Sequence, residues 1–126
     1  MNIDELIKFC LINQDAVYDY PWSDKKYKNI PVLRNKKNKK WFALIFELDN
    51  QLCVNLKCKP EDSWILQDLY SFITPAWHMN KSHWCKVDVN KIEPEVLDAI
   101  IKRSFDITNK KHSKSISAFN ITSKNC

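Results

Sequence analysis

A short segment near the middle of the chain, residues 77–84, gathers the side chains best suited to chemistry or recognition. His78, Asn80, Lys81 and His83 supply imidazole, amide and ammonium groups, all of which donate hydrogen bonds. A tight turn would present several of them together as a cradle for a phosphate or a carboxylate. In the structural alternative, Asn80 holds a left-handed turn, His78 hydrogen-bonds backbone carbonyls and Lys81 is solvated. The sequence leaves both interpretations open.

Two tryptophans, Trp77 and Trp84, flank these polar residues. They could stack on bases or line a pocket for an acidic small molecule or a partner peptide, and the alternative for both is core packing. Trp41 and Trp64 fit a core on their own periodicity. Lys57 lies on the more polar face of a predicted strand and could join the anion cradle.

A metal or catalytic site is not indicated. His78, His83 and Cys85 are plausible ligand types, but their spacing matches no HExxH or paired CxxC pattern. Cys85 beside His83 lacks an evident orienting acid. The chain contains no glycine, which excludes the standard Walker, Rossmann and G-x-S-x-G motifs. We therefore expect a protein that is not an enzyme and needs no cofactor.

Positive charge is concentrated in two segments. Residues 25–40 hold eight cations and no acid, and residues 109–126 hold four lysines and no acid, so the net charge of +5 leaves an acidic body. Such segments suit a phosphate backbone, where each neutralised phosphate releases counterions. The alternative for the first segment is a solvated hairpin. The cations that we consider candidate contacts there are Arg34, Lys36, Lys37, Lys39 and Lys40.

Compartment signals agree with one another. The five cysteines form no CxxC pair, which predicts reduced and mostly buried thiols. The N-terminus carries acids where a secretory signal needs basic residues, and no apolar run is long enough to cross a bilayer. We expect a cytoplasmic protein without a membrane partner.

Periodicity predicts the elements that must position these side chains. Helices are expected over about 2–13, from Pro60 to about 70–72, and from Pro94 to about 107. Extended segments or strands are expected over 16–22, 30–34, 41–48, 52–57, 73–77 and 84–89, with Pro31 indicating an edge strand. In the absence of glycine, asparagines mark the turns. They are Asn35, Asn38, Asn50 and Asn90, and Asp49-Asn50 turns the chain after the strand over 41–48.

This order predicts an α+β fold of two layers, an antiparallel sheet covered on one face by helices. The second helix should contribute a broad core stripe that includes Trp64, Ile65 and Leu69. We expect one domain over residues 1–108 and a basic Ser/Asn/Lys-rich tail over 109–126.

Two ordered blocks resemble a known family. Residues 78–84 read His-Met-Asn-Lys-Ser-His-Trp, and residues 54–60 read Val-Asn-Leu-Lys-Cys-Lys-Pro. Together they resemble the MmcQ/YjbR family over about residues 3–108, with weaker matches at 20–22, 41–44 and 104–106. The resemblance implies a CyaY-like, YjbR-type fold, DNA binding through a double-wing arrangement and no established enzyme activity.

Two functional hypotheses follow. The first is a cytoplasmic domain that binds double-stranded DNA with the 25–40 hairpin as one wing and the His78–Trp84 segment or the tail as a second contact. Because lysine outnumbers arginine, that binding should be weak, steeply salt-dependent and largely sequence-independent. The alternative is a module that binds a protein or a small acidic ligand through the His78–Trp84 segment. DNA binding requires the cations of 25–40 to share a surface with Lys81, whereas a pocket protein leaves them scattered.

Overall fold

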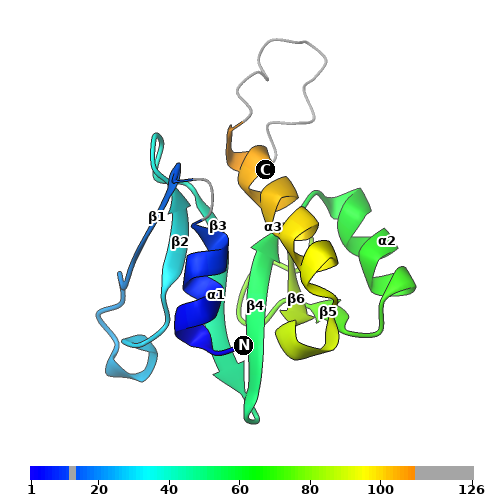
Figure 1. Cartoon of the computed structure of the whole chain (residues 1–126), viewed down its shortest axis with the longest axis horizontal. Coiled ribbons are helices and arrows are strands. Elements are labelled where there is room, and N and C mark those ends of the chain that lie inside the picture. The colour runs from blue at the N-terminus through cyan, green and yellow to red at the C-terminus, as the bar shows by residue number, and fades with distance from the viewer. Residues whose placement is uncertain (12–13, 110–126) are drawn as a thin grey trace.

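The structure is a computed structural model that describes residues 1–11 and 14–109 of the 126-residue chain. Over these residues it contains three α-helices, two 3₁₀ turns and six β-strands (Figure 1). The helices and turns are α1 (Ile3–Cys10), η1 (Lys25–Tyr27), α2 (Pro60–Leu69), η2 (Val89–Lys91) and α3 (Pro94–Asn109). The strands are β1 (Ala16–Asp19), β2 (Val32–Asn35), β3 (Trp41–Leu48), β4 (Gln51–Lys57), β5 (Ile73–Pro75) and β6 (Trp84–Asp88).

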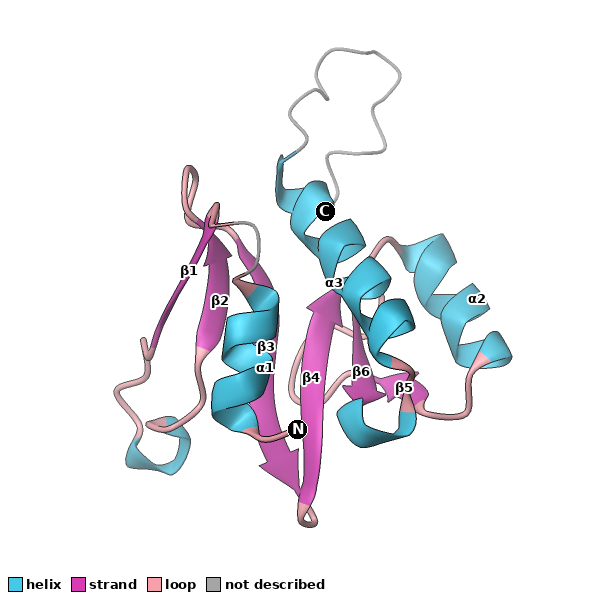
Figure 2. Cartoon of the chain, in the orientation of Figure 1, coloured by secondary structure: helices cyan, strands magenta, loops and turns pink. Residues whose placement is uncertain are grey.

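The strands form one antiparallel sheet in the order β1-β2-β3-β4-β6-β5. Figure 2 shows the helices on one side of this sheet, so the predicted two-layer α+β fold is confirmed. Strand β2 pairs with both β1 and β3, so the prediction that Pro31 marks an edge strand was wrong. Pro31 lies just before β2, and its carbonyl accepts a hydrogen bond from the Ile45 amide at 3.2 Å.

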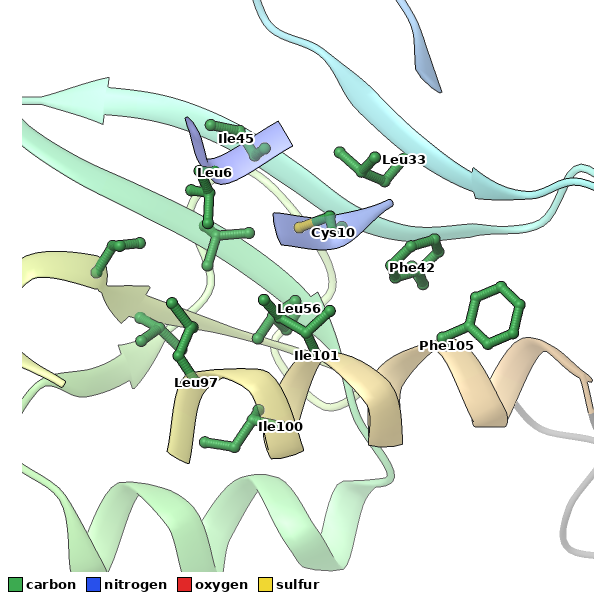
Figure 3. Close-up of a cluster of buried hydrophobic side chains, with 14 of the residues drawn as sticks. Leu6, Cys10, Leu33, Phe42, Ile45, Leu56, Leu97, Ile100, Ile101 and Phe105 are labelled. Atoms are coloured by element: carbon green, nitrogen blue, oxygen red, sulfur yellow. The ribbon is translucent and has the colours of Figure 1, made fainter. Parts of the chain in front are cut away.

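The core lies between the helices and this face of the sheet. Side chains from α1 and α3 pack there on apolar side chains of β2, β3 and β4 (Figure 3). Leu6, Leu33 and Leu97 are fully buried. Burial of one such leucine contributes about 1.5–3 kcal/mol, so the helix positions follow from this shared apolar surface.

An irregularity in β3 places Trp41 on the opposite face. Leu33 pairs with Ala43, but the next residue, Arg34, pairs with Trp41, which leaves Phe42 as an extra residue on β3. The Phe42 ring points to the helices and lies 5.3 Å from that of Phe105. With strict alternation Trp41 would share the face of Ala43, so the bulge turns the indole away from the helices.

Helix α2 differs from expectation. Trp64, Ile65 and Leu69 are 74%, 56% and 65% exposed, so the predicted core stripe was wrong. The fully buried residue of α2 is the small Ser63, whose hydroxyl accepts a hydrogen bond from Gln67 at 2.9 Å. An apolar pattern that surrounds much of a helix does not identify the buried side, and packing on the sheet selected the side of Ser63.

Left-handed backbone occurs without glycine. The hairpin between β3 and β4 turns at Asp49 and Asn50, with φ of 52° and 64°, as the sequence predicted. In the turn between β2 and β3 the left-handed residue is Lys39, with φ of 64°, and not either neighbouring asparagine. Asn90 lies in η2.

The remaining predictions concern the ends of the chain. Helix α3 extends to Asn109, and the rest of the predicted tail, residues 110–126, lies outside the described residues, as do residues 12–13 of the predicted first helix. No helix in the described part of the chain is both long and apolar enough to cross a membrane.

Candidate functional site

The sheet face opposite the helices is partly covered by the segment that follows β5. Asn55 of β4 is fully buried there, and its side-chain amide donates to the Trp77 carbonyl at 2.7 Å and accepts from the Trp77 amide at 3.2 Å. The Trp77 indole stacks on Phe46, with ring centroids 4.4 Å apart and an interplanar angle of 24°. A buried polar group and an aromatic stack thus fix Trp77 over the middle of the sheet.

His78 turns the chain at this point. Its φ of 57° is left-handed, a conformation that costs a residue with a Cβ about 1 kcal/mol or more. Its exposed imidazole lies against two rings, with centroids 4.3 Å from Trp77 and 6.3 Å from Tyr27. His78 therefore takes the left-handed role that the structural alternative gave to Asn80.

The other polar residues of the segment hold its own backbone. The Lys81 ammonium donates to the Ala76 carbonyl at 2.8 Å, and the Asn80 side chain accepts from the Ser82 amide at 2.8 Å. Within residues 1–11 and 14–109, the buried Nδ1 of His83 has no hydrogen-bond partner. The predicted cradle of His78, Asn80 and Lys81 is thus occupied largely with bracing the segment itself.

Lys57 and Trp84 form a separate contact. They face each other in the pairing of β4 and β6, and the Lys57 ammonium lies 5.6 Å from the Trp84 ring centroid. Trp84 is 7% exposed, so it packs as a core residue. Trp84 and His83 are not among the residues that line the pocket described next.

A pocket of about 300 Å³ lies between the 76–83 segment and the stretch that connects β1 to β2. We call it the aromatic pocket, and its main lining residues are Trp22, Tyr27, Trp41, Trp77, His78 and Met79. Its aromatic rings contact one another in series: Trp22 lies 5.7 Å from Trp41 and 5.9 Å from Tyr27, and Tyr27 lies 6.3 Å from Trp77. The sequence pointed to Trp77 and His78 and gave no pocket role to Trp22 and Tyr27. Its assignment of Trp41 to the core was wrong, because Trp41 is half-buried and lines the pocket on the face away from the helices.

The candidate lysines of the hairpin lie on the turn between β2 and β3. Lys36, Lys37, Lys39 and Lys40 are all exposed, and we call residues 36–40 the basic turn. The flanking Asn35 side chain accepts from the Lys37 amide, and that of Asn38 accepts from the Lys40 amide, both at 2.9 Å.

Helix α3 holds this turn in place. The Asn35 amide donates to the Thr108 hydroxyl at 3.1 Å and to the Asn109 side chain at 3.2 Å, and the Asn38 amide donates to the Thr108 carbonyl at 2.8 Å. The two asparagines were predicted as turn markers, but the sequence gave no indication of their contact with α3. They anchor the basic turn to the end of the helix.

Arg34 and the lysines of η1 lie elsewhere. The Arg34 guanidinium makes a bidentate ion pair with Asp19, at 2.9 and 3.1 Å, and lies 5.5 Å from the Trp41 ring centroid. Lys25 and Lys26 belong to η1, at the opposite end of β2 from the basic turn (Figure 1). The cations of residues 25–40 therefore do not form one continuous surface.

The described cysteines are buried and unoxidised. Cys10, Cys53, Cys58 and Cys85 are buried free thiols, as predicted, and Cys126 lies outside the described residues. The neighbouring Cys58 thiol and burial raise the pKa of Cys85, which disfavours its thiolate. No group of three or more potential ligands (His, Cys, Asp or Glu) lies together within residues 1–11 and 14–109.

Similarity to known proteins places the chain in a family. The family model for YjbR matches residues 13–107. The chain is 38% identical over 101 residues to YyaQ of Bacillus subtilis (71% of this chain, 83% of the relative) and 30% identical over 97 residues to YjbR of Escherichia coli K12 (75% of each). Both relatives are named as uncharacterized proteins.

Solved structures share the fold. A crystal structure of a Pseudomonas syringae protein superposes with a TM-score of 0.75 at 29% identity, covering 86% of this chain and 99% of that one. A Deinococcus radiodurans protein at 24% identity superposes with a TM-score of 0.72, over 87% of this chain and 80% of that one, which supports the fold alone. By its sequence match over most of its length, the chain belongs to the YjbR family.

Proposed function

We propose that this is a non-enzymatic cytoplasmic protein that binds double-stranded DNA through the basic turn. The observation that carries the proposal is the clamp of Asn35 and Asn38 on α3, which presents four exposed lysines on a fixed turn. A lysine-rich turn that is held in place loses less conformational entropy on binding than a free loop would. Buried free cysteines suit the reducing conditions of the cytoplasm.

A second source of positive charge begins at the same place. The Asn35 side chain contacts Asn109 at 3.2 Å, and Lys110 and Lys111 follow Asn109 directly in the sequence. Consecutive Cα atoms are about 3.8 Å apart, so the basic C-terminal segment starts close to the basic turn.

The cations of residues 25–40 are divided between the two ends of β2, so they do not form the single surface with Lys81 that the two-contact DNA hypothesis required, and the proposal is confined to the basic turn. Arg34 is paired with Asp19 and the Lys81 ammonium donates to the Ala76 carbonyl, so neither is assigned to DNA. The remaining contacts are lysines, which act as point charges on phosphates and read guanine less well than arginine does. We therefore expect weak, sequence-independent binding whose log–log salt slope is about −0.9 for each phosphate neutralised.

Fluorescence anisotropy of a labelled duplex over a salt series tests the proposal. The variant Lys36→Ala/Lys37→Ala/Lys39→Ala should bind at least tenfold more weakly at low salt and show a slope shallower by about 2 to 3. Its matched control is Lys25→Ala/Lys26→Ala/Lys28→Ala, which removes equal charge at the other end of β2 and should change affinity much less. Equal losses of affinity in the two variants would indicate attraction by net charge alone. Absence of binding by the wild type at about 50 mM salt would refute the proposal.

A further inference from the structure

We propose that the aromatic pocket is a second binding site, which takes a planar aromatic ring carrying a negative charge. The site is separate from the basic turn, because none of residues 36–40 lines it. Its volume of about 300 Å³ lies at the lower end of the range typical for small-ligand pockets, about 300 to 1,000 Å³.

The shape of the lining selects a flat ligand. Trp22 and Trp41 meet nearly edge to face, at an interplanar angle of 77°, and Tyr27 meets Trp77 at 76°. A planar ring placed among these indole and phenol rings would find both stacking and edge-to-face partners. Leu44 and Ile30 complete the lining with apolar surface.

The walls of the pocket are fixed before any ligand binds. The Trp22 indole donates to the Ile30 carbonyl at 2.7 Å, and the Asn55 amide holds the Trp77 backbone through two hydrogen bonds. His78 keeps a left-handed backbone with φ of 57° at the border of the pocket. Strain of this kind persists where surrounding contacts impose it, and it is concentrated at binding sites. A ligand would therefore meet preorganised rings, which lowers the cost of binding.

Charge around the rings selects the sign of the ligand. The Lys26 ammonium lies 5.8 Å from the Tyr27 ring centroid, and the Arg34 guanidinium lies 5.5 Å from that of Trp41. An aromatic cage for a cationic ligand leaves its ring faces open to that ligand, whereas here two protein cations already approach the rings. Asp19 neutralises Arg34, whereas the Lys26 ammonium forms no ion pair within residues 1–11 and 14–109, so Lys26 is the cation assigned to an acidic substituent.

Three bicyclic compounds of similar size test the site by NMR titration of the full chain. Naphthalene-2-carboxylate is planar and anionic, naphthalen-2-ylmethylamine is planar and cationic, and decalin-2-carboxylate is anionic but not planar. The readout is the indole N–H resonance of each tryptophan. A Kd of about 1 mM is expected for a fragment of this size.

The planar anion should shift the resonances of Trp22, Trp41 and Trp77 saturably and leave those of Trp64 and Trp84 unchanged. It should bind at least threefold more tightly than either of the other two compounds. Absence of saturable shifts up to about 10 mM, or equal shifts at the exposed Trp64, would overturn the site. Tighter binding of the cation would overturn the assigned charge, and equal binding of the decalin would overturn the assigned planarity.

A pair of tyrosine variants locates the binding. Tyr27→Ala removes a ring from the lining and should weaken binding of naphthalene-2-carboxylate about fivefold or more. Tyr18→Ala removes a ring that is 44% exposed on β1 and lies outside the lining, and it should leave the Kd unchanged. Equal affinities in the two variants would contradict the proposal, and the wild-type titration decides the matter if Tyr27→Ala does not fold.

Discussion

The side chain of Asn55 binds both the backbone carbonyl and the backbone amide of Trp77. Asn55 belongs to β4, whereas Trp77 lies in the segment that follows β5. The amide of Asn55 is completely buried, so it has no access to water when this contact is broken. The contact fixes the Trp77 indole on Phe46 and brings His78 to the border of the aromatic pocket. One buried side chain on β4 thus positions the segment that the sequence marked as chemically richest.

Asn55→Leu should lower the free energy of unfolding by about 2–3 kcal/mol, because it leaves the amide and the carbonyl of Trp77 without partners. Urea unfolding measures the change. The control is Asn80→Ala, which removes one bond to the Ser82 amide at an exposed site and should cost less than about 1 kcal/mol. Equal losses of stability in the two variants would show that the hydrogen bonds between Asn55 and Trp77 are not an important stabilising contact.

The exposed face of α2 should tolerate polar residues. Trp64→Gln/Leu69→Gln is expected to change the free energy of unfolding by no more than about 0.5 kcal/mol, because both side chains are mostly in solvent. Leu97→Ala in α3, which empties a fully buried position, should cost about 2–5 kcal/mol. A fall of more than about 1.5 kcal/mol in the free energy of unfolding of the α2 variant would contradict the exposure of Trp64 and Leu69.

Stability should fall in alkaline solution through Cys10. Burial raises the pKa of the Cys10 thiol from its ordinary value of 9.0 to about 12. Above about pH 9 the unfolded chain loses this proton while the folded chain keeps it, so the free energy of unfolding falls by about 1.4 kcal/mol per pH unit until the folded pKa is reached.

Urea midpoints of the reduced protein between about pH 8 and pH 10.5 would reveal this slope. Cys10→Ala removes the thiol, so its stability should fall less steeply with pH than that of the wild type. Parallel pH profiles for the two proteins would argue against this assignment.

Asn38→Ala should weaken DNA binding although it removes no charge. The Asn38 amide donates to the Thr108 carbonyl and its oxygen accepts from the Lys40 amide. The variant therefore loosens the basic turn, which keeps only the Asn35 contacts with α3. We expect a stability loss of about 1 kcal/mol and a several-fold weaker complex with an unchanged salt slope.

Anisotropy of the labelled duplex and hydrogen exchange of residues 36–40 would measure both effects. Asn29→Ala, at an exposed position after η1, is the matched control. Unchanged affinity together with faster exchange in the turn would separate the clamp from DNA binding.

Local patterns were sufficient for the order of the helices and strands and for the fold class, although the expected strands over 16–22 and 73–77 end at Asp19 and Pro75. Alternation and helical spacing predicted β3, β4 and α3 closely, because side-chain direction repeats along one element and needs no distant partner. The Asp49-Asn50 turn followed from the absence of glycine, since asparagine and aspartate tolerate left-handed backbone better than most residues. The concentration of charge in two segments is likewise a property of the sequence alone.

Tertiary structure decided the surroundings of the candidate residues. The extra residue Phe42 in β3 sends Trp41 to the face away from the helices, where it meets Trp22, and no periodicity announces a bulge. Helix α2 buries Ser63 and exposes Trp64 because its orientation depends on the sheet edge beneath it.

The composition of residues 77–84 thus pointed to one part of the functional surface, and the chain by itself fixed which groups are available there. Their partners, Asn55 for Trp77 and Thr108 for Asn38, are far away in the sequence. Hydrogen bonds and ring contacts between distant residues depend on the packing of whole elements, so only the folded structure could reveal the aromatic pocket and the anchored basic turn.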